Sequence, residues 1–367
     1  MPELEQLQLI GFLEDLAPTS LQEEYDNSGW IVNLSDSFRK ALLTLDCTPE
    51  VVQEARQEGC DLIISHHPIV FKGLKRLSNQ HYVEQAVINA IQCGISLYAI
   101  HTNLDNVLNK GVNQSLARRL GLENGQILRP LLGQLSKLSI FVPSEHTATL
   151  EAALFDAGAG SIGNYSNCSF LTSGLGSFKP TDGAKPKIGE LGTRSFVQEN
   201  RVEVLVENWK INAILQAARL AHPYEEMAYD LVALENEHQG LGSGLIGSLP
   251  KALPVQEFLN LIKTRLPAQS LKYTPPIKSN IEKVAICGGA GGFLLPHAIR
   301  AGADVLVTAD FKYHEYFEAI GKIMVVDPGH YETEHHLAEH LSVLLKEKFP
   351  NFATLISQVN TNPVNYY

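Results

Sequence analysis

The feature that most restricts the fold of this chain is a regular alternation of short apolar strands and amphipathic helices in its first 127 residues. The alternating segments are, in chain order, a strand at 40–46, a helix at 48–57, a strand at 61–65, a helix at 80–93 and a strand at 95–100. A threonine–proline pair is typical of a helix start, and Gly94 is typical of a helix end. Strands joined by helices form a parallel sheet with helices on its faces, so this alternation predicts an α/β fold.

The same alternation returns after residue 240. The elements predicted there are strands at 283–286, 304–308 and 322–326 and helices at 294–301, 313–320 and 332–348. Two separated stretches with one pattern favour a single α/β domain built in two lobes. We assign residues 1–127 and 237–367 to this domain.

The segment between the two stretches has a different pattern. Its predicted elements are a strand at 137–142, a helix at 144–157 capped by Ser144, a loop rich in Gly, Ser and Pro at 172–192, a strand at 201–207, a helix at 208–221 and a strand at 227–234. We interpret the order as β-α-β-β-α-β, which is that of a ferredoxin-like unit. Residues 128–236 are therefore predicted to form an inserted α+β domain.

The composition restricts the class of protein. Hydrophobic residues make up 44% and charged residues 19%, as in globular proteins. The 29 basic and 40 acidic side chains give a net charge of −11, which argues against nucleic acid as the main partner. Residues 1–16 form an amphipathic helix pattern rather than a signal peptide, and no apolar run reaches the roughly 18 residues of a membrane span. With five scattered cysteines and no CxxC pair, a cytoplasmic protein that does not contact membranes is expected.

Side chains able to bind metal gather in three segments, each directly after a predicted strand. They are SHHP with His66 and His67, HTNLD with His101 and Asp105, and DPGHYETE with Asp327, His330 and Glu334. In open α/β sheets, ligands bind at the carboxyl ends of the strands. The three segments are therefore expected to meet at one site.

The ligand types favour two divalent ions over one. His330 and Glu334 are four residues apart, so they share one face of a helix and can reach one ion together. A tetrahedral zinc needs three or four ligands, whereas two ions about 3.5–4 Å apart use more, including bridging carboxylates. Zinc, iron and manganese all suit imidazole and carboxylate ligands.

Several other residues have two interpretations. A second helical site at His335, His336 and His340 competes with a solvated helix face, which we favour. His101 either orients a ligand, binds metal itself or packs. The glycine-rich segment 288–292 (GGAGG) is typical of a phosphate-binding turn or simply of a tight turn.

Two further residues are candidates for proton transfer. Asp310 and His314 follow the strand at 304–308, so both are expected near the site, as general acid or base. In the alternative interpretation, Asp310 only caps the next helix.

Taken together, these motifs resemble one family. SHHPIVF (65–71), AIHTNLD (99–105), TADFKYHEYFEA (308–319), DPGHYETE (327–334) and YDNSGWIVN (25–33) are similar to motifs of the GTP cyclohydrolase I type 2 homologues, also called the Ngg-interacting-factor family. The resemblance covers residues 1–127 and 240–367, and the middle segment is similar to the PII-like or CutA-like insert of the long bacterial members. The resemblance implies a dinuclear metal site in a toroidal homohexamer. The ligands it implies are His66, His67, Asp105, His330 and Glu334. Where other members often have a second histidine in a KHH stretch, this chain has Tyr313.

Two functions are compatible with such a site. The first is a metal-dependent hydrolase that opens the imidazole ring of GTP, or of a related small heterocycle, at C8 and releases formate. The second is a regulatory or metal-chaperone protein without turnover, as suggested by the inserted domain. A metal that merely holds the two lobes together is a third possibility.

Overall fold

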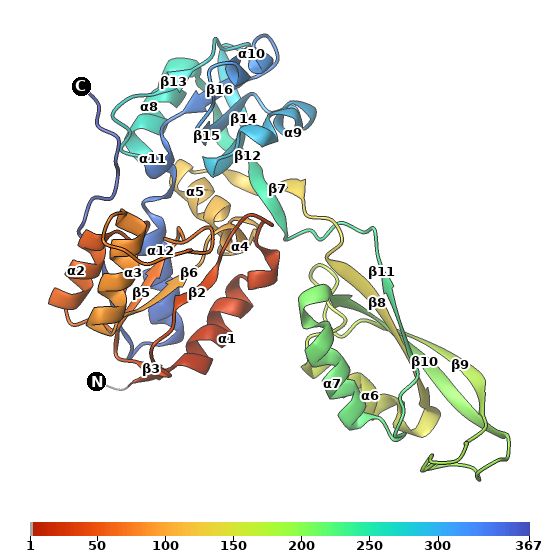
Figure 1. Ribbon diagram of the computed structural model, residues 1–367. Coiled ribbons are helices and arrows are strands. Elements are labelled where there is room, and N and C mark those ends of the chain that lie inside the picture. The colour runs from red at the N-terminus through yellow and green to blue at the C-terminus, as the bar shows by residue number, and fades with distance from the viewer. Residues whose placement is uncertain (1–2) are drawn as a thin grey trace. The chain divides into compact units, whose positions relative to one another are not determined.

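The computed structural model describes residues 3–367, which divide into two compact units (Figure 1). The main unit comprises the described residues up to Pro130 together with Gly240–Tyr367, and the middle unit is Leu131–Gln239. No helix in the described part of the chain is both long and apolar enough to cross a membrane. The predicted α/β fold is confirmed for the main unit by its two mixed sheets.

The first sheet of the main unit has the strand order β17-β4-β5-β6-β2. Its strands are β2 (Gly29–Val32), β4 (Lys40–Thr44), β5 (Leu62–Ser65), β6 (Ser96–Ala99) and β17 (Ala353–Ile356). All neighbours are parallel except β2 and β6, as expected for strands joined by helices. A small antiparallel pair, β1 (Leu4–Glu5) and β3 (Ser37–Phe38), precedes β4.

Helices cover this sheet. They are α1 (Gln6–Leu16), α2 (Pro49–Gln57), α3 (Tyr82–Cys93) and α12 (Leu337–Lys348). Apolar residues of α2 and α3 form one core with Leu42, Ile63 and Leu97 of the sheet, whereas α12 contacts β4 and β17. Gly94 ends α3 in the left-handed conformation that favours glycine, as the sequence predicted.

The second sheet of the main unit has the order β13-β16-β15-β14-β12-β7. Its strands are β7 (Glu123–Pro130), β12 (Gly242–Pro254), β13 (Lys272–Tyr273), β14 (Asn280–Ala290), β15 (Val305–Ala309) and β16 (Met324–Asp327). The strands β14, β15 and β16 are parallel, and the remaining pairs are antiparallel. The helices that contribute to this lobe are α5 (Val112–Leu120), α8 (Val255–Arg265), α9 (Leu295–Arg300) and α10 (Glu315–Ala319). Two separate apolar cores, one with α5 and α8 and one with α9 and α10, lie on the two faces of the sheet.

The two lobes do not correspond to two halves of the sequence. The strand β7 comes from the first stretch of the chain but pairs with β12, whereas α12 and β17 come from the end of the chain and complete the first sheet. The chain thus returns from the second lobe to the first directly after the short helix α11 (His330–Glu334). A second short helix, α4 (Thr102–Asp105), follows β6.

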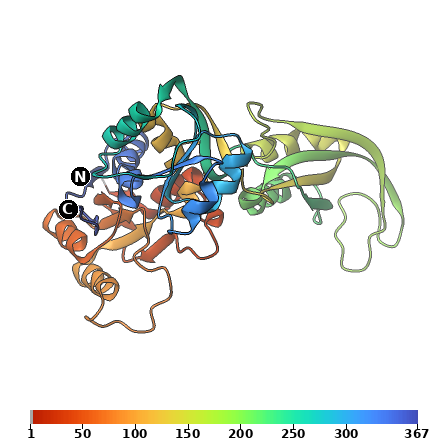
Figure 2. The ribbon, with the colours of Figure 1, turned by 90° about the horizontal axis from the view of Figure 1, so that it is seen from above.

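The middle unit has the element order β8-α6-β9-β10-α7-β11, as labelled in Figure 1, and Figure 2 shows its yellow to green ribbon from another side. The elements are β8 (Leu135–Pro143), α6 (Thr147–Asp156), β9 (Ser169–Phe178), β10 (Ser195–Glu207), α7 (Ile211–Ala221) and β11 (Tyr229–Ala233). Its antiparallel sheet has the order β11-β8-β10-β9, and both helices pack on one face of it, against residues such as Ile140 and Val202. Short 3₁₀ turns complete the fold at Thr19–Leu21, Ser144–His146, Asn208–Lys210 and Gly292–Leu294.

Three predicted elements are wrong in part. The first part of the loop predicted at 172–192, up to Phe178, is strand, because β9 pairs with β10 along its whole length despite its Gly and Ser content, and the rest of the segment is loop. The helix predicted at 332–348 is two helices, α11 and α12, since α11 turns its side chains to the site described below while α12 packs on the first sheet. Ser144 begins a 3₁₀ turn and is not the cap of α6.

Candidate metal centre

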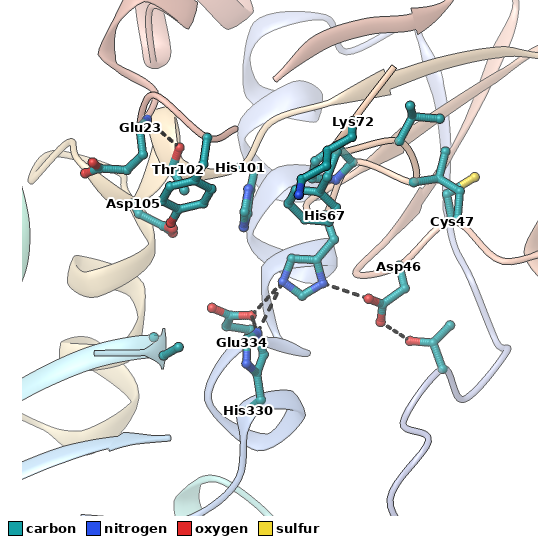
Figure 3. A pocket seen from close by; sticks show the side chains of 18 of the residues that line it. Glu23, Asp46, Cys47, His67, Lys72, His101, Thr102, Asp105, His330 and Glu334 are labelled. Atoms are coloured by element: carbon teal, nitrogen blue, oxygen red, sulfur yellow. Dashed lines mark hydrogen bonds and ion pairs between the residues drawn. The ribbon is translucent and has the colours of Figure 1, made fainter. Parts of the chain in front are cut away.

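Four of the five predicted ligands, His67, Asp105, His330 and Glu334, line one cavity of about 1190 Å³ in the main unit (Figure 3), and the fifth, His66, is fully buried next to them. His66 and His67 follow β5 directly, and Asp105 is the last residue of α4 after β6. His330 and Glu334 are the first and last residues of α11. The carboxyl ends of strands in both lobes therefore supply the site, as expected for an open α/β sheet.

The ligand atoms form two groups that share Glu334. In one group, His66 Nε2 lies 3.6 Å from Asp105 Oδ1 and 4.0 Å from Glu334 Oε1. In the other, His67 Nε2 and His330 Nε2 lie 3.1 and 3.0 Å from Glu334 Oε2. The ligand atoms in each group lie within 4.8 Å of one another, which is close enough to hold a metal ion. One carboxylate thus faces both groups, with one oxygen toward each.

Two buried polar atoms support metal binding at the first group. His66 Nε2 and Asp105 Oδ1 are buried, and neither has a hydrogen-bond partner in the described part of the chain. Buried polar atoms without partners are costly, and nearly all such atoms in native proteins are satisfied. A divalent cation between these two atoms satisfies both, so the residues present fit a metal ion.

The first-lobe histidines are oriented through their other ring nitrogen. His66 Nδ1 lies 2.8 Å from the carbonyl oxygen of Ile100, and His67 Nδ1 lies 2.7 Å from Asp46 Oδ1. A carbonyl oxygen only accepts, so His66 donates its Nδ1–H and leaves the Nε2 lone pair for metal. The Asp46 carboxylate imposes the same arrangement on His67.

His101 and His330 have the same kind of support. His101 Nδ1 lies 2.7 Å from Asp26 Oδ1, and His330 Nδ1 lies 2.6 Å from Asp310 Oδ2. The ring nitrogens of His101, His66 and His67 form a third group within 4.8 Å. Among the interpretations of His101, simple packing is therefore the least consistent with the structure, because a dedicated carboxylate orients a ring that faces the site.

Without a metal ion, the site retains protons. Burial alone would lower the pKa of His67, but hydrogen bonds with Asp46 and Glu334 raise it to about 9. Burial likewise opposes the effect of Asp310 and Glu334 on His330, and these carboxylates raise its pKa to about 11. Burial and the neighbouring Glu334 raise the pKa of Asp105 well above its usual value. In the metal-free centre, these three groups thus keep protons that a bound cation would displace.

Two glycines of the GGAGG segment leave room for the ligands. A Cβ atom on Gly289 would lie 2.5 Å from Glu334 Oε1 and 3.0 Å from His330 Cε1, and its φ is +57°. A Cβ on Gly288 would lie 3.3 Å from Glu334 Oε1 and 2.8 Å from a methyl carbon of Val112. The segment belongs to the end of β14, and its glycines allow α11 to approach the sheet closely.

The two candidates for proton transfer, Asp310 and His314, differ in their position relative to the site. Asp310 orients His330 and does not cap α10, whose first residues have no side-chain cap. The expectation that His314 lies at the pocket is wrong, because His314 is exposed, packs against Tyr313 and Phe317, and does not line the cavity.

The interpretation of His335, His336 and His340 as a solvated face is also wrong. His336 is buried, His335 stacks on Tyr331, and His340 Nε2 lies 2.7 Å from the carbonyl oxygen of Lys110. None of the three belongs to a potential metal group among the described residues.

Three residues that support the ligands, Asp26, Asp46 and Thr361, have roles that no sequence motif indicated. Thr361 Oγ1 donates to Asp46 Oδ2 at 2.6 Å, so the end of the chain supports the carboxylate that orients His67. Asp46 was detectable in principle, since it ends a predicted strand at the same edge as the ligands. No local pattern identifies Thr361, which lies 315 residues from Asp46 in the chain.

Comparisons with known proteins identify relatives along nearly the whole chain. A family model described as Duf34/NIF3 (NGG1p interacting factor 3) matches residues 5–363. A protein of Halalkalibacterium halodurans named GTP cyclohydrolase 1 type 2 homolog is 38% identical over 364 residues, covering 98% of each chain. A protein of the same name from Bacillus subtilis is 36% identical over 365 residues, again with 98% of each chain covered.

Solved structures with the same fold span the whole chain. The crystal structure of a Bacillus cereus protein related to NIF3 matches with a TM-score of 0.86 at 34% identity and covers 99% of both chains. The Staphylococcus aureus protein SA1388 matches with a TM-score of 0.79 at 29% identity and covers 100% of both chains. Main and middle units together are therefore present in these relatives.

Proposed function

This chain belongs to the Duf34/NIF3 family, and we propose that it is a dinuclear metal-dependent hydrolase acting on GTP or a related small heterocycle. The relatives from Halalkalibacterium halodurans and Bacillus subtilis are named as GTP cyclohydrolase 1 type 2 homologues, which supports the substrate class. In this proposal the ligands are His66, His67, Asp105, His330 and Glu334. The ions are zinc, iron or manganese.

The position of Glu334 is the observation that carries the proposal. Its two oxygens face different histidines, at 3.0–3.1 Å for His67 and His330 and at 4.0 Å for His66. A carboxylate shared in this way is typical of sites with two ions about 3.5–4 Å apart. A single structural ion would need only one of the two groups and would leave the other without a purpose.

Bound divalent ions supply Lewis acidity and lower the pKa of water, which is the chemistry that ring opening requires. The side chains of the protein hold the reacting geometry. His66 donates its Nδ1 proton to Ile100 and keeps Nε2 available, and Asp310 fixes the ring of His330. Asp310 thus acts as a positioning residue rather than as a general acid or base. Hydrolysis at C8 of GTP uses two water molecules: the first opens the ring and leaves a formamide, and the second releases C8 as formate and leaves the amine.

The assembly and location belong to the same proposal. The strand order β11-β8-β10-β9 with two helices on one face supports a ferredoxin-like assignment for the middle unit. We propose a homohexamer, which should have a mass near six times 40.3 kDa by light scattering. All five cysteines are free thiols, which supports a reducing compartment such as the cytoplasm.

The function is tested by metal analysis and formate release. Purified protein loaded with zinc, iron or manganese should contain two ions per chain and release formate from GTP. The variant Asp105→Asn removes a ligand from one group only, so it should keep one ion and lose turnover. Glu318→Gln, at an exposed position on α10, is the matched control and should change neither property. Full metal loading without formate release would refute the hydrolase and favour a protein without turnover.

A further inference from the structure

Two basic side chains line the cavity that contains the metal centre, one from each lobe. Lys72 lies in the irregular loop between β5 and α3, and Arg129 lies near the end of β7. Lys72 lines the same cavity as His67 and Asp105, and Figure 3 labels all three side chains. In a chain with a net charge of −11, two cations beside a cluster of carboxylates need an explanation.

Neither cation is neutralised by the protein. Within residues 3–367, no ion pair is formed by Lys72 or Arg129, although both are exposed. Two other basic residues of the second lobe are paired, since Lys272 Nζ lies 2.7 Å from Asp327 Oδ2 and Lys278 contacts Asp304. Lys72 and Arg129 therefore keep their charge available to a small molecule in the cavity.

The sheet register places Arg129 at the metal-centre end of β7. Arg129 pairs with Ser243 of β12. The Ser243 hydroxyl donates to Asn106 Oδ1 at 3.1 Å, and Asn106 directly follows Asp105. A short chain of contacts thus connects the strand position of Arg129 to the ligand Asp105.

An aromatic ring holds the guanidinium of Arg129. Its Cζ atom lies 5.5 Å from the centroid of the Phe293 ring, within the range of a cation–π contact. This contact restricts the guanidinium plane and leaves its N–H donors for a planar or tetrahedral anion. Exposed Tyr25, Phe71 and Phe293 also line the cavity, and aromatic faces of this kind stack on heterocyclic rings.

The glycine-rich segment does not provide an alternative anion site. Its backbone N–H groups already donate to side chains: Gly288 to Asn113, Gly289 to Thr333 and Gly291 to Thr308, at 2.9–3.1 Å. A phosphate cradle needs such N–H groups to be available. Apart from the candidate metal centre, the charged partners for an anionic group in this cavity are therefore the cationic side chains.

From these observations, we propose that Arg129 is the specificity residue that makes the cavity select a phosphorylated heterocycle over its uncharged counterpart. The guanidinium contacts the phosphate, while the ring lies toward the metal centre. Lys72 makes a second, weaker contact from the opposite lobe. This inference rests on the proposed function, because it assigns the substrate class of the same site.

The test is equilibrium binding to metal-loaded, full-length protein without turnover. Guanosine and GMP are the probes, and calorimetry measures both dissociation constants. We expect GMP to bind at least about tenfold more tightly than guanosine. Arg129→Met should abolish this preference by weakening GMP alone, and Arg129→Lys should restore part of it. Lys72→Met should reduce the preference by a smaller factor.

The matched control is Arg265→Met, which removes an exposed arginine of α8 that does not line the cavity. It should leave the preference of GMP over guanosine unchanged, and circular dichroism should show that all variants are folded. A preference that persists in Arg129→Met overturns the proposal, because the phosphate then contacts the metal centre. GMP binding no tighter than guanosine, including binding of neither, also overturns it. These outcomes are independent of formate release, so the hydrolase proposal fails or stands separately.

Discussion

The two lobes contribute to the candidate metal centre in different ways. The first lobe provides His66 and His67 on a loop at the end of β5, where His66 is fully buried. The second lobe provides His330 and Glu334 on a helix of five residues that begins after Gly329, whose φ is +109°. The side chain of His330 is 37% exposed. A rigid strand end thus faces a short helix whose position depends on glycines, at Gly329 and at Gly289 of β14.

This difference indicates that the two lobes have separate roles in binding metal. The first lobe orients its histidines through Asp46, Asp26 and a backbone carbonyl before any metal binds. The second lobe brings Glu334, the group that faces both sets of ligands. If so, first-lobe substitutions should weaken one ion, whereas loss of Glu334 should affect both.

The largest expected effect is that of Glu334→Gln. A neutral amide cannot bridge two cations, so affinity for both ions should fall by at least about 100-fold, with the fold retained. Metal content after dialysis against a weak chelator measures this, with Glu347→Gln on the exposed side of α12 as control. Retention of two ions in Glu334→Gln would remove the basis of the comparison.

Next in size are the carboxylates that orient the histidines. Asp46→Asn and Asp310→Asn should each lower metal affinity about 10- to 100-fold, as is typical of such partners. Because the Asp310 side chain is 53% exposed and that of Asp46 33%, water should replace Asp310 more readily, and Asp46→Asn should have the larger effect. Titration with a fluorescent zinc indicator compares the two variants. Equal losses would show that the lobes do not differ in preorganisation.

The metal-free protein should become less stable as the pH rises, because His67 is protonated in its fold. The pKa of His67 rises from 6.5 in the unfolded chain to about 9 in the metal-free fold, so its contribution to stability is complete below pH 6.5 and lost as the pH rises through 9. The melting temperature of chelator-treated protein should therefore fall between pH 6.5 and 9. Metal-loaded protein should not show this fall, because the cation replaces the proton. A parallel fall in both forms would assign the titration to other groups.

The sequence predicted those residues of the candidate centre that lie close to a strand end in the chain. His66, His67, Asp105, His330 and Glu334 each follow a strand closely, so periodicity and strand-end placement brought them into one hypothesis. Their partners come from distant segments: Asp26 lies 75 residues from His101, and no spacing rule connects them. The pairing of β17 with β4 likewise joins segments far apart in the chain, so no local pattern predicts it.

The middle unit shows the complementary case. Its β9 contains Gly174 and Gly176 and has a composition typical of a loop. Ten consecutive pairs with β10, from Ser169 to Phe178, hold it as a strand. Tertiary pairing overrides local propensity here, as it does where α11 and α12 separate without Gly or Pro between them.

The smallest expected effect is that of Thr361→Val, which tests whether the end of the chain contributes to the first-lobe side. The hydroxyl of Thr361 donates to Asp46 Oδ2, and the other oxygen of Asp46 lies 2.7 Å from His67 Nδ1. Losing one hydrogen bond of this kind should weaken metal binding by about 2- to 10-fold, less than Asp46→Asn does. Thr361→Ser keeps the hydroxyl and should retain the affinity of the unmodified protein. The control Thr264→Val, at an exposed position of α8, should have no effect. Affinity in Thr361→Val equal to that of the unmodified protein would mean that Asp46 is held by His67 alone, and that the first lobe needs no support from the chain end.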